Sequence, residues 1–192
     1  MSADSLFLQR MRALAETELS SPRLVLEPLQ ARHAPLLFAG LSEPSLYTYI
    51  PQDPPTDHGA LTARFERIAR RGGARGDEVW LNWAMRMVDG SYCGQFEATA
   101  NVGGYVDIAY FVFAPMQGHG IATEAGATAI AALRARGATR IGASLDTRNL
   151  ASAALVERLG MKRVKTEVAA DFFKGASSDE FRYELAYQGD AS

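Results

Sequence analysis

The stretch VDIAYFVFAPMQGHGIATEAGATAIAALRAR, from Val106 to Arg136, decides how this chain folds. Its first part, within residues 105–113, is rich in aromatic and β-branched residues, which predicts a strand. Pro115 closes that strand, because proline cannot donate to a sheet ladder. From Ala122 onward, apolar residues recur at the spacing of one helical face, which predicts a long helix. The stretch therefore predicts a strand, a glycine loop and a helix in succession.

The loop itself, Gln117-Gly118-His119-Gly120-Ile121-Ala122, is suited to binding an anion. Two glycines at a helix entrance permit a tight turn and let a ligand approach the main chain. The first N–H groups of the helix are unpaired and the helix dipole is positive there, so a phosphate is the natural guest. The loop has no lysine, which a Walker phosphate loop requires, and Thr123 stands where a dinucleotide-binding fingerprint has its third glycine. An ordinary loop–helix junction is the alternative interpretation.

A second block follows this helix. Residues 140–146 are expected to form a short strand, and another helix is expected between Asn149 and Gly160. Asparagine is a good N-cap and glycine is a good C′ residue, which supports these limits. The block reads N-x-x-S at its start, from Asn149 to Ser152, and E-R-L-G-M at its end.

The two blocks together resemble the GNAT superfamily of N-acetyltransferases, in particular its RimJ/RimL-like branch. The resemblance lies in the loop pattern Gln-x-x-Gly-x-Ala, in DIAYFV before it and ATEA after it, and in the second block. It implies an α/β (α+β) fold with a mixed, mostly antiparallel sheet of about six to seven strands, flanking helices and splayed central strands. It also implies an acyltransferase that moves an acetyl group from acetyl-CoA to a primary amine, either a protein N-terminal amine or a small-molecule amine. The implied reaction is direct attack in a ternary complex.

The resemblance also implies which residues contact the cosubstrate acetyl-CoA. Backbone groups near the end of the first strand would hold the thioester and the pantetheine arm, and the loop amides would hold the pyrophosphate. The implied residues are Phe111, Val112, Gln117, Gly118, His119, Gly120, Ile121, Ala122, Asn149 and Ser152. His119 could help to neutralise phosphate, or it could be an exposed spectator.

The base is open among three carboxylates. An alkyl amine with a pKa near ~10.4 must lose a proton before it attacks, so a base is needed. Glu97 is the first choice, because alternation on a strand over 92–100 places it on one face with Cys93 and toward the acceptor cleft. Asp107 and Asp146 are alternatives, and each of the three could instead be a paired structural carboxylate. Glu124 is expected to be a first-turn helix residue stabilised by the dipole.

Many GNAT enzymes carry a tyrosine in the last helix as the acid that protonates the leaving thiolate. Val156 stands at the matching position, so the resemblance leaves Ser152 as the catalytic residue at the sulfur. This departure favours a second hypothesis, a non-catalytic acyl-CoA-binding sensor or regulatory subunit. Tyr47 and Tyr49 lie in an irregular stretch whose family counterpart borders the acceptor site. Each could bind substrate or merely pack the loop.

The rest of the chain predicts one domain. Residues 1–20 are expected to form an N-terminal helical extension, and residues 21–188 a single acetyltransferase domain. Further strands are expected over 21–29, 79–87, 92–100, 162–170 and 180–187, and further helices over 31–41 and 57–71.

Composition excludes several other classes of protein. The 192 residues carry a net charge of −2, so a broad basic surface for nucleic acid is not expected, and the arginines of 57–71 are expected to form a solvated face. One cysteine, Cys93, and three histidines without zinc spacing provide no metal site. No apolar run reaches the roughly 18 residues of a membrane span and no secretory signal is visible, which favours a cytoplasmic protein. The expected partners are acetyl-CoA and an amine acceptor, and family analogy allows a homodimer.

Overall fold

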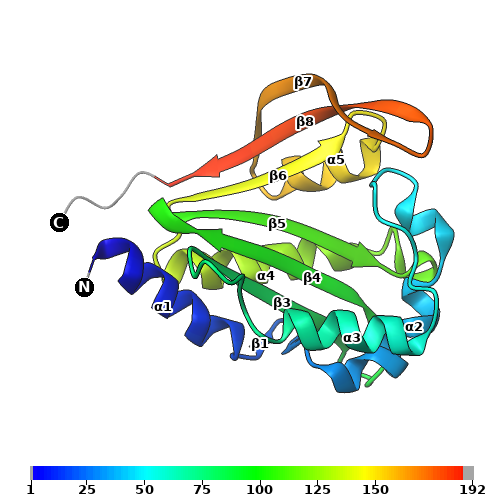
Figure 1. Cartoon of the computed structure of the whole chain (residues 1–192), viewed down its shortest axis with the longest axis horizontal. Coiled ribbons are helices and arrows are strands. Elements are labelled where there is room, and N and C mark those ends of the chain that lie inside the picture. Colours follow the sequence, from blue (N-terminus) through cyan, green and yellow to red (C-terminus); the bar gives the residue numbers. More distant parts are fainter. Residues whose placement is uncertain (1, 188–192) are drawn as a thin grey trace.

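The computed structural model describes residues 2–187, which form one open sheet with helices on both faces (Figure 1). The strands are β1 (Leu19–Ser20), β2 (Leu24–Pro28), β3 (Glu78–Met87), β4 (Tyr92–Asn101), β5 (Tyr105–Val112), β6 (Arg140–Asp146), β7 (Lys162–Phe173) and β8 (Ala176–Ala186). The α-helices are α1 (Ala3–Ala15), α2 (Ala34–Leu41), α3 (His58–Ile68), α4 (Ile121–Ala135) and α5 (Leu150–Arg158). Short 3-10 helices cover Ala31–His33, Pro44–Tyr47, Val102–Gly104 and Ala114–Met116.

The sheet order is β1-β2-β3-β4-β5-β6-β8-β7, with β5 and β6 parallel and the other neighbours antiparallel. The expected α/β class with a mixed, mostly antiparallel sheet is therefore confirmed. The described part of the chain has eight strands, more than the six to seven expected. The extra strand is β1, whose two residues are too short for alternation to reveal. Residues 1 and 188, the outer limits of the expected extension and domain, lie outside the described residues.

Two apolar cores lie on opposite faces of the sheet. The larger core packs side chains of α1, α4 and α5 against the sheet, with Met11, Phe96 and Leu133 among its buried residues. The smaller core packs α2 and α3 against the other face and contains Phe65 and Phe111. Within residues 2–187, no helix is both long and apolar enough to cross a lipid bilayer.

The expected helix near the N-terminus belongs to the larger core. α1 buries Phe7, Leu8, Met11, Leu14 and Ala15 against the sheet. After the helix, the chain is tied down where the indole Nε1 of Trp83 donates to the carbonyl of Thr17 at 3.0 Å. The segment that precedes the resemblance to the family thus packs on this domain.

A β-bulge in β4 places Cys93 on the face opposite to the one expected. The pairing with β3 shifts its register between Met85 and Arg86, which leaves Cys93 as an inserted residue. Cys93 packs in the larger core with Phe96, whereas Glu97 contacts α3 on the other face. The expectation that Cys93 and Glu97 share a face is wrong, because alternation fails across a bulge.

The central strands β5 and β6 splay apart, as expected. They share three ladder pairs, from Tyr105 opposite Arg140 to Asp107 opposite Gly142. Beyond these pairs, β5 continues to Val112 and β6 continues to Asp146 with no further pairing between them in the described chain. Backbone N–H and C=O groups that lack a ladder partner must find another one. The gap is therefore where a ligand can meet the main chain.

Candidate functional site

A cavity of about 700 Å³ lies where β5 and β6 diverge. It is bordered by the end of β5, the glycine loop, the first turns of α4 and α5, and the 3-10 turn around Leu46. Its lining residues are Ser45, Leu46, Tyr49, Tyr110, Phe111, Val112, Met116, Gln117, Gly118, Gly120, Ile121, Ala122, Thr123, Asn149, Ala151, Ser152, Ala154, Leu155 and Arg158. All residues that the sequence suggested for cosubstrate binding are among them except His119.

The glycine loop presents an uncapped helix N-terminus to this cavity. Gly118 and Gly120 adopt φ of +77° and +75°, left-handed conformations that favour glycine. Gly120 is the N-cap of α4 and offers no side chain to the first-turn amides. The side chain of Gln117 donates to the carbonyl of Val112 at 3.0 Å, which ties the loop to the end of β5. The first amides of a 15-residue helix thus remain free to bind an anion.

Glu124, in the first turn of α4, braces this loop against the beginning of the sheet. Its carboxylate accepts from the Ser21 hydroxyl at 2.7 Å and from Nε of Arg23 at 2.6 Å. Burial raises its pKa, but the hydrogen bonds from Ser21 and Arg23 outweigh burial and lower the pKa below the usual value. Nη1 of Arg23 also donates to the carbonyl of His119 at 3.0 Å, while the His119 side chain is exposed. Glu124 is therefore a structural carboxylate.

The first turn of α5 forms the other wall of the cavity. Asn149 caps the helix, with its side-chain oxygen accepting from the amide of Ser152 at 3.1 Å. The Ser152 Oγ in turn accepts from the hydroxyl of Tyr110 on β5 at 2.9 Å. This hydrogen bond crosses the gap between the splayed strands. Tyr110 lies in the DIAYFV block, but nothing local in the sequence indicates its partner on α5.

Glu97 lies on the opposite face of the sheet from Tyr110. Its Oε1 accepts from Nε2 of Gln95 at 2.7 Å and from Nη2 of Arg64 on α3 at 3.3 Å. Burial raises the pKa of Glu97, and the nearby Arg64 charge opposes that rise. Glu97 is opposite Ala109 in the β4–β5 ladder, alongside the part of β5 that borders the gap, but it does not line the cavity.

The other two candidate bases are engaged in ion pairs. Asp146 accepts from Nε of Arg148 at 2.8 Å and from the buried Ser178 hydroxyl at 2.7 Å. These bonds, the Arg148 one foremost, lower the pKa of Asp146 to about 2. Asp107 accepts from Nη2 of Arg182 at 2.6 Å and from the Tyr105 hydroxyl at 2.9 Å. Both carboxylates are thus paired with arginines, but burial raises the pKa of Asp107 to about 6, the opposite direction to Asp146.

The two tyrosines of the 43–55 stretch have different surroundings. Tyr47 is buried, and its hydroxyl donates to the carbonyl of Leu41 at 2.7 Å while its ring packs on Phe111. Tyr47 is therefore a packing residue in this structure. Tyr49 is 36% exposed and lines the cavity.

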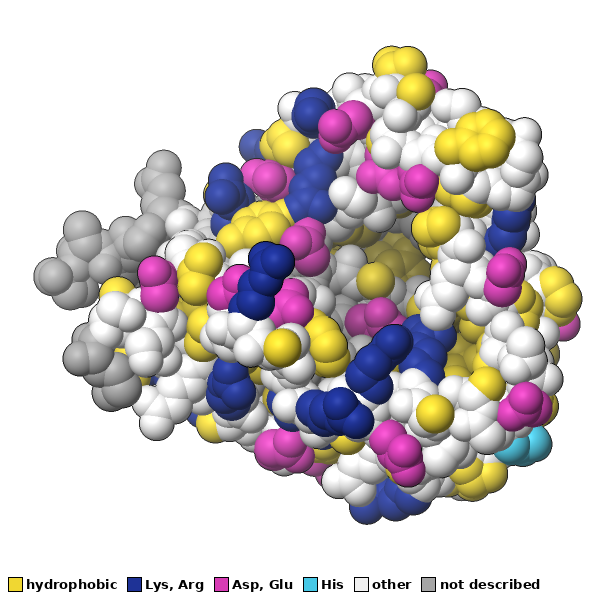
Figure 2. Space-filling model, viewed as in Figure 1, with side chains coloured by type: hydrophobic (Ala, Val, Ile, Leu, Met, Phe, Trp, Pro, Cys, Tyr) yellow, Lys and Arg dark blue, Asp and Glu magenta, His cyan; other side chains and the backbone are white. Residues whose placement is uncertain are grey.

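The space-filling view shows a hollow between the β7–β8 hairpin and α3, with charged side chains of both signs at its edge (Figure 2). Lys174 lies at the tip of the β7–β8 hairpin. Its Nζ donates to the carbonyl of Tyr47, to that of Ile50 at 3.0 Å and to that of Gln52 at 3.2 Å. We call these three hydrogen bonds the Lys174 contact.

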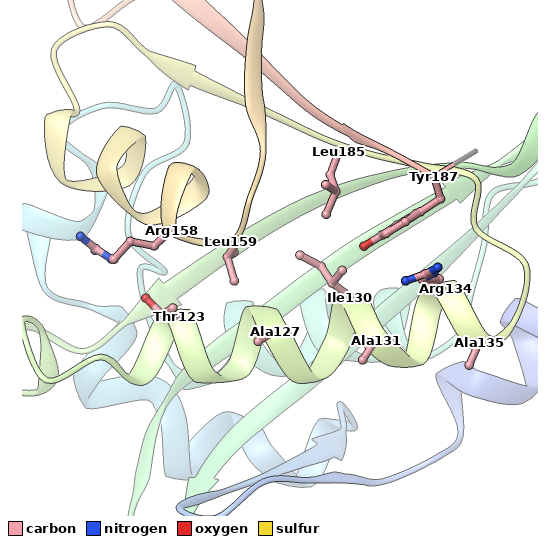
Figure 3. Close-up of a pocket in the computed structure, with 10 residues that line it drawn as sticks. All are labelled: Thr123, Ala127, Ile130, Ala131, Arg134, Ala135, Arg158, Leu159, Leu185 and Tyr187. Atoms are coloured by element: carbon pink, nitrogen blue, oxygen red, sulfur yellow. The ribbon is translucent and has the colours of Figure 1, made fainter. Parts of the chain in front are cut away.

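A second groove, of about 680 Å³, lies between α4, the end of α5 and the end of β8 (Figure 3). Small and apolar side chains line it, and the guanidinium of Arg134 stacks over the ring of Tyr187 at 4.4 Å. Thr123 and Arg158 border both this groove and the cavity. The groove contains none of the candidate acid–base residues.

Comparison with known proteins agrees with this geometry. The model of a family described as the acetyltransferase (GNAT) domain matches residues 23–162. A search of curated proteins found no match.

Solved structures share the fold at low sequence identity. An acetyltransferase from Salmonella typhimurium that modifies the N-terminal serine of a 50S ribosomal subunit protein is 17% identical, with 90% of this chain and 100% of that chain covered and a TM-score of 0.78. A probable acetyltransferase from Chromobacterium violaceum is 24% identical, with 89% and 86% covered and a TM-score of 0.75. The microcin self-immunity acetyltransferase MccE, solved with acetyl-CoA and AMP, is 17% identical, with 87% and 94% covered and a TM-score of 0.75.

Proposed function

Since this chain belongs to the GNAT acetyltransferase family, we propose that it transfers the acetyl group of acetyl-CoA to a primary amine by direct attack in a ternary complex. The observation that carries this proposal is the cavity between β5 and β6, which joins an uncapped helix N-terminus to an unpaired strand edge and to Ser152. A pyrophosphate, an extended pantetheine arm and a thioester sulfur require these three features in that order.

The amides of the α4 N-terminus would bind the pyrophosphate, because free N–H groups and the helix dipole both favour an anion. The unpaired edge of β5 near Phe111 and Val112 would hydrogen-bond the pantetheine arm as a neighbouring strand would. The sulfur would then lie near the first turn of α5, within reach of the Ser152 hydroxyl. The occupied relative MccE supports acetyl-CoA as the ligand of this fold.

The acceptor amine would approach from the sheet face that carries Glu97. Glu97 would take a proton from the amine, directly or through water, and the nitrogen lone pair would form a bond to the thioester carbonyl carbon. The carbon–sulfur bond then breaks, and the thiolate takes a proton from Ser152. Tyr49, exposed at the cavity margin, is our candidate for contact with the acceptor.

A second candidate function is a non-catalytic acyl-CoA-binding subunit. The observation that favours this binding subunit is Val156. It is buried and apolar, at the position where many family members have a tyrosine that acts as the general acid. Turnover with an amine would distinguish the two functions, because a sensor would bind acetyl-CoA without releasing CoA.

A thermal melt with acetyl-CoA tests the shared step of both functions. At about 100 times its Kd, a ligand adds roughly 2.7 kcal/mol to the free energy of unfolding. For a domain of this size, that corresponds to a rise of roughly 5–10 °C in the midpoint. NAD and ATP should give no such rise. Absence of a shift at millimolar acetyl-CoA would contradict the proposal.

Two variants at Gly118 make this test specific for the loop. Aspartate and asparagine tolerate the left-handed conformation better than other side chains, and a Cβ at Gly118 meets no neighbouring atom. Gly118→Asp adds a negative charge beside the proposed pyrophosphate and should abolish most of the shift. Gly118→Asn has the same shape without the charge and should keep most of it. Equal shifts in both variants would exclude the loop as the anion site.

Glu97→Gln tests the proposed base. The variant should retain the acetyl-CoA thermal shift and lose roughly 10²–10³-fold in kcat, the usual contribution of a general base. In the wild type, kcat/KM should fall as pH falls through the pKa of Glu97, which burial raises above 4.5. Glu66→Gln, at an exposed position on α3, is the control and should behave as wild type. Intact turnover in Glu97→Gln would assign the base elsewhere.

A further inference from the structure

We propose that Tyr110 is a positioning residue for the acid step: its hydroxyl, by donating to Ser152, directs the single proton of Ser152 toward the sulfur of bound CoA. This inference rests on the proposed function. It assigns a role to a residue that neither the loop motif nor the α5 motif contains.

The geometry of the pair comes first. Tyr110 reaches across the gap from β5, and its hydroxyl lies 2.9 Å from the Oγ of Ser152 in the first turn of α5. Both residues line the cavity. The pair therefore lies where the sheet edge and the helix approach each other, beside the space that the pantetheine arm would occupy.

The number of hydrogen bonds that a serine hydroxyl can make determines where the proton of Ser152 points. A serine hydroxyl has one proton to donate and two lone pairs to accept with. One lone pair of Ser152 is used by Tyr110, and its own proton has no hydrogen-bond acceptor among the residues that the structure describes. That proton is thus free to point into the cavity, where the sulfur of a bound thioester would be the acceptor.

The surroundings of Tyr110 keep it a donor. Burial raises the pKa of Tyr110 above its usual value, and the nearby positive charge of Arg158 opposes that rise. The phenol therefore stays protonated throughout the neutral range. Val156 offers no phenol from α5, and the phenol of Tyr110 on β5 acts instead through the Ser152 hydroxyl.

The proton balance closes without another reactant. When the carbon–sulfur bond breaks, the thiolate takes the proton of Ser152, and Ser152 takes the proton of Tyr110. The guanidinium of Arg158 lies near enough to stabilise the transient phenolate by its charge. The ammonium form of the acceptor gives one proton to Glu97 before attack, and Glu97 releases it to solvent. The attacking nitrogen gives up a second proton from the tetrahedral adduct, and water returns a proton to Tyr110. The net products are the amide, CoA and one proton.

The test uses Tyr110→Phe, Ser152→Ala and the double variant, each checked for a wild-type melting temperature. The first measurement is the pKa of the thiol of bound CoA. It is obtained by titration, with the ultraviolet absorbance of the thiolate recorded in difference spectra against desulfo-CoA. It needs no knowledge of the acceptor. A proton donor at the sulfur stabilises the thiolate, so the thiol pKa should be higher in Tyr110→Phe than in wild type.

The second measurement is steady-state acetyl transfer to whichever amine the wild type accepts. Tyr110→Phe should lower kcat about tenfold, the value of one hydrogen bond of about 1.4 kcal/mol, and leave KM for acetyl-CoA within about twofold. In the Ser152→Ala background the same change should cost less than about twofold, because Tyr110 acts through Ser152. Tyr105→Phe removes a hydroxyl on the same strand that bonds Asp107 instead, and it should leave both measurements unchanged.

The outcomes separate the two proposals. Equal losses in both backgrounds, or an unchanged thiol pKa in Tyr110→Phe, would overturn the role of Tyr110 while acetyl transfer stands. A wild type that neither shifts its melt with acetyl-CoA nor binds CoA would overturn the proposed function itself.

Discussion

At the scale of single residues, the surroundings of each carboxylate separate its chemistry from that of the others. Asp146 and Glu124 accept hydrogen bonds from arginines and hydroxyls, and both have a lowered pKa. Glu97 is partly buried, with Arg64 as a more distant partner, and burial raises its pKa. A base for an amine works best when its pKa approaches the working pH. Glu97 is shifted in that direction, and so is Asp107, whose pKa burial raises to about 6 while Arg182 pairs with its carboxylate.

Asp146 should make the free energy of unfolding depend on pH in the acid range. Its pKa falls from 3.8 to about 2 on folding, and since one pKa unit is worth about 1.4 kcal/mol, its ion pair contributes about 2 kcal/mol. A lowered folded pKa means that this contribution is complete above about pH 4 and is lost as pH falls toward about 2. Chemical denaturation at several pH values should show the loss in wild type.

Asp146→Asn should remove this acid-dependent loss and should already be less stable at neutral pH. Asp53→Asn, at an exposed position, is the matched control and should retain the wild-type pH dependence. If wild type and Asp146→Asn lose the same stability as pH falls, the acid-dependent loss arises from other groups.

At the scale of elements, the sequence predicted whatever depends on local periodicity and on caps. The strand before the loop, α4, β6 and the Asn149 cap all follow from spacing and from residue type at a helix end. The bulge at Cys93 did not follow, because one inserted residue reverses alternation without changing composition. A glycine marks this bulge: at Gly94 a Cβ would lie 2.0 Å from the carbonyl oxygen of Phe111.

The candidate site was predictable to the same extent. Residues contributed by one continuous motif, such as Gly118 and Gly120, could be assigned from sequence. The Tyr110–Ser152 hydrogen bond joins a strand to a helix across the gap, and only the splay of β5 and β6 brings these residues together. The partners of Asp146 and Asp107 likewise include residues of β8, which no local pattern connects to them.

α1 should be required for the stability of the domain. Met11 is fully buried against the sheet, and removing a buried methionine side chain usually costs about 2–5 kcal/mol. Met11→Ala should therefore lower the free energy of unfolding by roughly that amount in a denaturant titration. Leu6→Ala changes a side chain of the same helix that is 38% exposed, and it should cost less than about 1 kcal/mol. Equal small losses would mean that α1 packs only weakly on the domain.

At the scale of the whole molecule, the Lys174 contact joins two segments that are far apart in sequence. It holds the tip of the β7–β8 hairpin against the loop that carries Tyr49. The contact therefore orders the loop that carries Tyr49, the residue proposed to contact the acceptor.

Lys174→Met should release this loop without unfolding the domain. The substitution keeps an unbranched side chain and removes the three hydrogen bonds. We expect limited proteolysis within residues 43–55 to accelerate several-fold, while the melting temperature changes by less than about 4 °C, as for an exposed site. Lys165→Met, on the exposed strand β7, is the control and should not change the cleavage rate. Unchanged cleavage in Lys174→Met would show that other contacts hold the loop.

The short junction between β5 and β6 divides the sheet into two ladders, β1 to β5 and β6–β8–β7, joined by three residue pairs. Proteins open in cooperative units that exchange their amide hydrogens together, and a weak junction is a natural boundary between two such units. A ligand that bonds both the β5 edge and the first turn of α5 would belong to both units. Its binding free energy would therefore slow the amide hydrogen exchange that requires the two ladders to separate. Amide exchange that arises from fraying of the outer strands would stay unchanged.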